Sequence, residues 1–173
     1  ELNISKEECN TQNWGLVIKQ DSIYFKKIKT IIAEYGYPGK SLVGEKTNES
    51  AGYVIHHYNS IEEYFPIIKK AGDDGELSKK LVAMMEDRLL MEKGKEQIYG
   101  TQIRGEKLKN GDYINFVWPI KDQKKVNERR KAIGFKSTIE EYANLFDLEY
   151  KVLTMNDVKK IRNGTFKEKS KKK

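Results

Sequence analysis

The chain has 173 residues, of which 38% are hydrophobic and 34% are charged, and its formal net charge is +7. This length is sufficient for one domain with a hydrophobic core, and no apolar run is long enough to span a bilayer. The single cysteine, Cys9, excludes an intrachain disulfide and a cysteine metal cluster.

The positive charge gathers at the C-terminus. Residues 167–173 hold five lysines and one glutamate, so the rest of the chain carries only +3. A terminal lysine run is typical of a solvated tail, and the remaining sequence has no arginine-rich stripe with interleaved aromatic residues. We therefore expect no specific binding of nucleic acid. The chain begins at Glu1, which a removed signal peptide or a trimmed start would explain, so the sequence leaves the compartment open, cytoplasmic or exported.

Residues 1–20 are interpreted as a polar lead-in, residues 21–153 as one globular domain, and residues 154–173 as a basic, disordered tail. Asp21 and Ser22 form a helix-start signal, and helical spacing of apolar residues predicts a helix over 21–35. Similar patterns predict helices over 48–58, 61–70 and 77–92. Ser60 followed by Glu63 is a capping-box pattern, and Pro66 inside the third helix predicts a kink.

The second half of the chain alternates short strands and helices. Residues 98–104 and 113–118 have strand character, and Asn110–Gly111 lies near the turn between them. Helices are expected over 122–133 and, from a capping-box pattern at Ser137 and Glu140, over 138–146; a short strand is expected over 150–153. The sequence therefore predicts a mainly α (α+β) fold with about six helices and a small antiparallel hairpin near 97–119.

The predicted helix over 77–92 carries charged residues close to its apolar stripe. A helical wheel places Arg88 near the centre of the stripe and Asp87 at its edge. An arginine in that position needs a partner, because an unpaired buried charge is very costly. Two interpretations stay open for Arg88: a structural ion pair, or the binding of a carboxylate or phosphate by its planar guanidinium.

His57 is the candidate for catalysis. Its side chain lies beside the apolar face of the predicted helix over 48–58, and the pKa of a free histidine lies near neutrality, so it would serve as a general acid or base. A structural, hydrogen-bonded histidine is the alternative. No spacing typical of a metal site, a phosphate loop or a nucleophile elbow occurs, so we predict no metal and no cofactor.

Polar residues in two further segments complete the candidate site. Tyr99, Thr101 and Gln102 lie in a stretch that otherwise resembles a strand, and a glycine between them suggests that another group approaches the backbone closely. Arg129 and Arg130 lie on the predicted helix over 122–133, where at least one of them is expected to face inward. These five residues, with Asp87 and Arg88, are the predicted ligand-binding residues.

Several motifs follow one another along residues 21–142. They are IIAEYGYPGKSLVG (31–44), IHHYN (55–59), the Asp87–Arg88 pair, QIYGTQ (97–102), WPIKD (118–122) and VNERRKAIG (126–134). In this order they resemble a bacterial family of unknown function that is marked by a YGTQ motif. The resemblance implies that His57 corresponds to the family histidine and that Asn59 stands where members usually have aspartate. It implies no established activity.

Two functions fit this sequence. The chain is interpreted first as a ligand-binding or interaction domain, with an anionic small molecule or a protein as its partner, because no nucleophile–base pair is evident. The alternative is a hydrolase or group-transfer enzyme that acts on an anionic small molecule, with His57 as acid or base.

Overall fold

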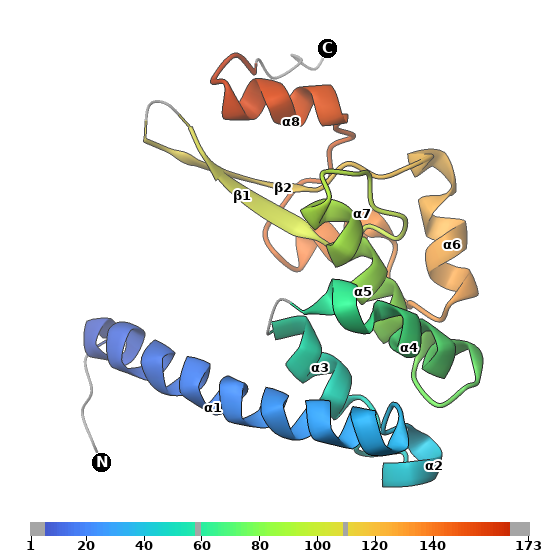
Figure 1. The fold of residues 1–173 in the computed structure, drawn as a ribbon. Coiled ribbons are helices and arrows are strands. Elements are labelled where there is room, and N and C mark those ends of the chain that lie inside the picture. Colours follow the sequence, from blue (N-terminus) through green and yellow to red (C-terminus); the bar gives the residue numbers. More distant parts are fainter. Residues whose placement is uncertain (1–5, 58–59, 109–110, 167–173) are drawn as a thin grey trace. The chain divides into compact units, whose positions relative to one another are not determined.

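A computed structural model of the chain describes residues 6–57, 60–108 and 111–166; for residues 6–19, 21 and 57 it describes the backbone alone. These residues form helices and a two-stranded antiparallel sheet (Figure 1), so the predicted mainly α, α+β fold class is confirmed. Contacts divide the chain into two compact units, residues 1–82 (unit 1) and 83–173 (unit 2). The expectation of one domain over 21–153 stays a prediction.

Unit 1 is helical. Its elements are α1 (Lys6–Tyr35), α2 (Lys40–Val43), α3 (Ser50–His57), α4 (Ile61–Asp73) and the beginning of α5 (Lys79–Glu92), which continues into unit 2. Helix α1 begins well before Asp21, so the predicted start of this helix is wrong. Aspartate and serine lower helix stability by only a fraction of a kcal/mol each, so a helix can continue through them.

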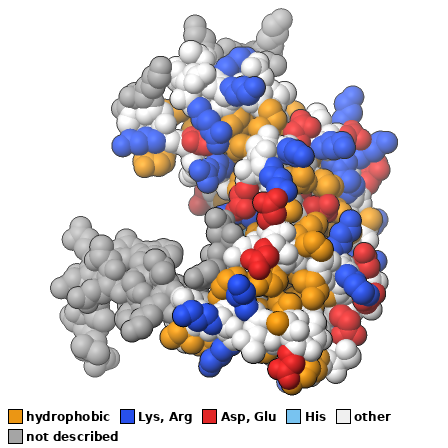
Figure 2. Space-filling model, viewed as in Figure 1, with side chains coloured by type: hydrophobic (Ala, Val, Ile, Leu, Met, Phe, Trp, Pro, Cys, Tyr) orange, Lys and Arg blue, Asp and Glu red, His pale blue; other side chains and the backbone are white. Residues whose placement is uncertain are grey.

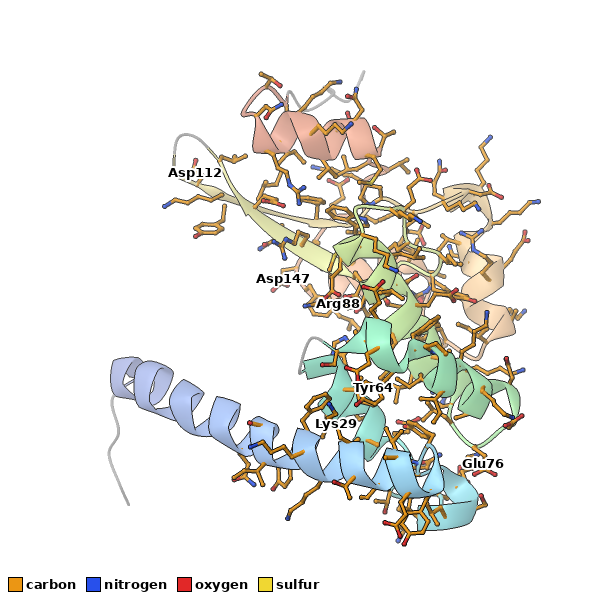
Figure 3. All side chains as sticks on the ribbon, viewed as in Figure 1. Lys29, Tyr64, Glu76, Arg88, Asp112 and Asp147 are labelled. Carbon is orange, nitrogen blue, oxygen red and sulfur yellow. The ribbon has the colours of Figure 1, made fainter. Side chains whose placement is uncertain are left out.

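The core of unit 1 forms where α1, α3 and α4 meet. The ring of Tyr64 (Figure 3) lies edge-on to that of Phe25, with centroids 5.8 Å apart, and Ile55 and Ile68 are fully buried. Ser60 occupies the N-cap position of α4, but its side chain makes no capping bond. Its ψ of 19° is not the extended conformation that capping requires, so the predicted capping box is wrong at this helix.

Unit 2 contains the sheet. Its elements are the rest of α5, β1 (Ile103–Lys107), β2 (Tyr113–Val117), the 3₁₀ helix η1 (Gln123–Lys125), α6 (Val126–Ala132), α7 (Ile139–Asn144) and α8 (Met155–Arg162). The strands pair antiparallel, from Ile103 opposite Val117 to Lys107 opposite Tyr113. The predicted hairpin is therefore present, although Asn110 of its turn lies outside the described residues. The first strand begins later than predicted, because residues 98–101 bind a side chain instead of a neighbouring strand.

Helices α6 and α7 follow the sheet. The predicted helix over 122–133 begins as η1 and continues as α6. The capping box of α7 is made by Thr138 and Glu141, one residue later than the predicted pair of Ser137 and Glu140. Ser137 lies one position before the N-cap, and its hydroxyl instead accepts a hydrogen bond from the Arg130 guanidinium, at 2.9 Å.

Helix α8 lies within residues 154–173, for which the sequence predicted a disordered tail. A capping box of Thr154 and Asp157 starts it, and Val158 and Ile161 are buried in a cluster with Trp118 of the segment after β2. The described part of the chain thus contains eight α-helices rather than about six, since α2 and α8 were not anticipated. No strand forms over 150–153, and residues 167–173 of the predicted tail lie outside the described residues.

Candidate functional site

Asp87 of α5 is the buried charge around which unit 2 is organised. Its side chain is fully buried, and it accepts hydrogen bonds from the backbone N–H groups of Ile98, Tyr99 and Thr101, at 2.6, 3.0 and 3.0 Å. The hydroxyl of Thr101 donates a further bond of 3.0 Å to the same carboxylate. We call residues 97–102 the carboxylate-bound loop. A site of backbone donors that could hold a substrate anion is therefore filled by the chain's own side chain.

Two arginines bind the other polar groups of the same loop. Arg129 donates to the carbonyl oxygen of Ile98 at 2.9 Å, and Arg130 donates to that of Tyr99 at 2.9 Å. The hydroxyl of Tyr142 donates to the carbonyl oxygen of Thr101, also at 2.9 Å. Asp87 thus binds the N–H groups of Ile98, Tyr99 and Thr101, while cations and a phenol bind the C=O groups of the same three residues, so the backbone polar groups of these residues are satisfied.

Glutamine side chains close the ends of the loop. Gln97 is fully buried; its amide nitrogen donates to the carbonyl oxygens of Gln102 and Trp118, and its amide oxygen accepts from the N–H of Gln102 at 2.8 Å. The amide of Gln102 donates to the carbonyl oxygen of Met84 in α5, at 3.2 Å. The loop is consequently fixed to α5 and to the segment after β2. Gln97 was not among the predicted site residues, although the motif contains it.

Burial changes the acidity of these charged groups. Burial raises the pKa of the Asp87 carboxyl group, and it outweighs the hydrogen bonds from Thr101, Ile98 and Tyr99, which lower that pKa. Burial also lowers the pKa of Arg130, and the attraction of Asp87 opposes this change. Arginine titrates far above neutral pH, so Arg130 stays cationic. A buried anion and a buried cation therefore stabilise the same loop from its two sides.

Tyr99 is the motif side chain that takes least part in this network. It is partly exposed, and burial together with the charges of Glu86 and Asp87 raises its pKa, whereas Arg129 lowers it. Thr101 and Gln102, by contrast, are buried and bonded to one another. The structure therefore brings six of the predicted ligand-binding residues together: Asp87, Tyr99, Thr101, Gln102, Arg129 and Arg130.

The predicted position of Arg88 is wrong. Its side chain lies at the surface of α5, 36% exposed, and forms an ion pair of 2.6 Å with Glu92 one turn later (Figure 3). The helical wheel assumed one buried side for α5, but the carboxylate-bound loop covers a second side, which holds Asp87. Asp87 is thus the inward charge, and a ligand-binding role for Arg88 stays a prediction.

We expect Arg88→Ala to change the free energy of unfolding by no more than about 0.5 kcal/mol, because an exposed ion pair between neighbouring helical turns contributes little. Urea denaturation of wild type and variant, followed by the fluorescence of Trp118, would measure the difference. A loss of several kcal/mol would show instead that Arg88 holds a buried partner.

His57 ends α3 in unit 1, and its side chain lies outside what the structure describes. Its predicted role as acid or base, and its predicted proximity to Arg88 and the loop, therefore stay predictions. Among the described side chains, no three histidine, cysteine, aspartate or glutamate residues gather closely enough to hold a metal ion. No helix in the described ranges is both long enough and apolar enough to cross a membrane.

An open cleft lies on the other side of α6. Its volume is about 540 Å³, and its lining comes from Asn127, Glu128 and Lys131 of α6 and from residues 135–138 of the turn into α7. Phe135 in this turn packs on Arg130, whose guanidinium lies 4.8 Å from the ring centroid. The sequence does not predict the cleft, because a turn of mixed composition has no periodic pattern of apolar residues.

These features define a helical α+β protein built around a buried carboxylate and the loop bound to it. The chain belongs to a family of unknown function, DUF6624, whose model matches residues 6–154. This confirms the predicted resemblance to a family without an established activity. No curated protein and no solved structure matches the chain.

Proposed function

We propose that the chain is a binding domain for an anionic ligand and that residues 121–136, here called the basic face, receive it. This segment contains seven Lys or Arg residues and two Asp or Glu residues, a net charge of +5. The rest of residues 83–166 carries −1, and residues 1–82 carry −1. The charge of the folded chain is therefore concentrated in η1, α6 and the turn that follows, a region of unit 2 where Lys and Arg side chains are frequent at the surface (Figure 2).

The exposed lysines of the basic face form no ion pairs with carboxylates in the described part of the chain, and this observation carries the proposal. The five lysines are Lys121, Lys124, Lys125, Lys131 and Lys136, and all of them are exposed. Arg129 and Arg130 bind carbonyl oxygens and a hydroxyl, which carry no net charge. Like charges that are gathered in this way repel one another, and they attract an anion by the same field.

In this proposal the carboxylate-bound loop supports the binding surface and is not itself the binding site. Arg129 donates to the carbonyl oxygens of Ile98, Lys121 and Asp122, so it ties the loop to the segment before η1. Arg130 ties the same loop to Ser137 beside α7. We propose further that the YGTQ motif of a bacterial family marks this support, with Asp87 as its anchor.

The double substitution Lys131→Gln and Lys136→Gln is expected to weaken the binding of tripolyphosphate about tenfold, because each exposed charge contributes up to about 1 kcal/mol to such an interaction. Titration calorimetry at low ionic strength would measure the affinity. In 0.3 M salt the wild-type affinity should fall as well, since the Debye length at that concentration is shorter than about 8 Å and the attraction between exposed charges is screened.

The matched control is Lys107→Gln with Lys159→Gln. Both lysines are exposed residues of unit 2 outside the basic face, so this variant loses the same net charge. It should bind nearly as wild type does. Equal weakening in the two double variants would show that net charge alone attracts the anion, and the proposal of a defined surface would fail.

A further inference from the structure

We infer that the ligand of the basic face is a small molecule that joins a planar ring to a phosphate chain, as a nucleotide does, and that it occupies the cleft beside α6. This inference rests on the proposed function, because it names the ligand class for the same surface. The cleft, at about 540 Å³, lies within the size range of sites that enclose small molecules.

Phe135 supplies a fixed flat surface for the ring. It lines the cleft, it is partly exposed, and the guanidinium of Arg130 packs on it, 4.8 Å from its centroid. Arg130 itself is 1% exposed and is bonded to Ser137 and Tyr99, so it cannot move away easily. An aromatic side chain that is held in place from below can stack on the ring of a ligand without losing much conformational freedom.

Two lysines supply the charge for the phosphate chain. Lys131 from α6 and Lys136 from the turn both line the cleft and are exposed, and Glu128 is the one acidic residue in the lining. Lysine ammonium groups on flexible stems can follow a phosphate chain without a fixed geometry. Glu128 opposes binding, so its removal provides a test with the opposite sign.

One hydroxyl group of the cleft, that of Ser137, is suited to an anion because its oxygen already accepts a hydrogen bond from a guanidinium. Ser137 accepts from Arg130 at 2.9 Å, and Thr138 accepts from the N–H of Glu141 at 3.2 Å. The Ser137 hydroxyl can therefore donate its own proton to a ligand oxygen, whereas the Thr138 hydroxyl bonds to the Glu140 carboxylate. Asn127 is engaged with Glu140 and with the N–H of Ile139. Few hydrogen-bonding groups of the cleft remain to recognise the edge of a base. We therefore expect stacking and charge, rather than hydrogen bonds to the base, to determine the affinity.

The test compares ATP with tripolyphosphate, which carries a similar chain of phosphates without a ring. Titration calorimetry with the full chain should show that ATP binds at least about fivefold more tightly, which is the lower end of the effect of stacking one base on an aromatic residue. Phe135→Leu should abolish this preference and leave tripolyphosphate binding unchanged, whereas Phe135→Tyr should retain it. Glu128→Gln should strengthen the binding of both probes about two- to fivefold, because it removes an exposed like charge.

The outcomes separate this inference from the proposed function. If wild type binds the two probes equally, the ring has no place in the cleft, although anion binding stands. If ATP binds more tightly but Phe135→Leu keeps that preference, the ring lies elsewhere and the cleft is excluded. If neither probe binds, the proposed function fails together with the inference. Melting curves establish that each variant is folded. If Phe135→Leu does not fold, Glu128→Gln, which also changes the lining of the cleft, still tests the location, because unchanged affinities in that variant would exclude the cleft.

Discussion

Asp87→Asn is expected to lower the free energy of unfolding of unit 2 by about 2–4 kcal/mol, because it leaves one or two buried N–H groups without an acceptor. One carboxylate oxygen accepts from Ile98 and Tyr99, and the other accepts from Tyr99 and from both donors of Thr101. An asparagine amide places its NH₂ group against one of these sets in either orientation. The substitution also removes the cost of burying a charged group at position 87. The expected loss in the free energy of unfolding is therefore smaller than the sum over the hydrogen bonds that Asp87 accepts.

The fluorescence of Trp118 is the measurement for this variant. Trp118 is 1% exposed and belongs to unit 2, so its environment changes when that unit unfolds. Chemical denaturation in a Trp14→Phe background would leave Trp118 as the single tryptophan. Arg88→Ala is the control, since it changes the neighbouring residue on the same helix but touches only an exposed ion pair. A loss below about 1 kcal/mol for Asp87→Asn would mean that the loop does not depend on a charged acceptor.

The sequence predicted the elements that local signals determine. Helix α5 ends before Gly94 as expected, β2 lies close to the predicted range of 113–118, and α6 ends before Gly134. Glycine after a helix and alternating apolar residues along a strand act over a few residues, so a single sequence contains them. Helix α8 also has such a signal, the capping pair of Thr154 and Asp157. It was missed because lysines dominate the segment and hide its two buried residues.

The candidate site depended on contacts that a local pattern does not contain. Asp87 and Thr101 are fourteen positions apart, and Arg130 meets Tyr99 over thirty-one positions. A helical wheel assumes that a helix buries only one face, so it placed Arg88 inward and Asp87 at the edge of that face. The strand pattern at 98–104 was misleading for a related reason: the N–H groups that a strand would pair are bonded to Asp87.

The residue types, by contrast, correctly indicated which residues form the buried polar network. The sequence singled out Asp87, Thr101, Gln102 and Arg130 because polar residues interrupt apolar patterns there, and all four are buried. Buried polar groups must be hydrogen-bonded, so such interruptions predict either a network or a binding site. The structure provides the network for these residues. The cleft is formed by residues next to them, which were not singled out, since a phenylalanine and two lysines near a turn have many ordinary explanations.

Gly100→Ala is expected to destabilise unit 2 by about 2–4 kcal/mol, because it adds backbone strain and a steric clash at one position. Gly100 has a φ of +73°, and a Cβ atom there would lie 2.5 Å from Cδ1 of Ile139 and 2.8 Å from Cδ1 of Ile120. Both isoleucines are buried in the cluster that joins α6, α7 and the end of β2, so neither side chain can swing into solvent. Denaturation followed by Trp118 fluorescence would again measure the loss.

Gly134→Ala separates strain from packing in this prediction. Gly134 has a φ of +93°, but a Cβ atom there meets nothing within 4 Å, so its substitution should cost only the strain of about 1–2 kcal/mol.

Ile139→Val removes Cδ1, the atom that lies closest to the Cβ added by Gly100→Ala. The double variant should therefore lose less stability than the sum of the losses in the two single variants. Strict additivity would show that Ile139 does not restrict the loop. If the double variant is more stable than additivity predicts, the loop that Asp87 binds also packs against α7 at Gly100. In that case a shift of this loop would also displace Arg130, which bonds to Tyr99 of the loop and to Ser137 of the cleft, and variants of Gly100 should weaken anion binding at neutral pH without any change in charge.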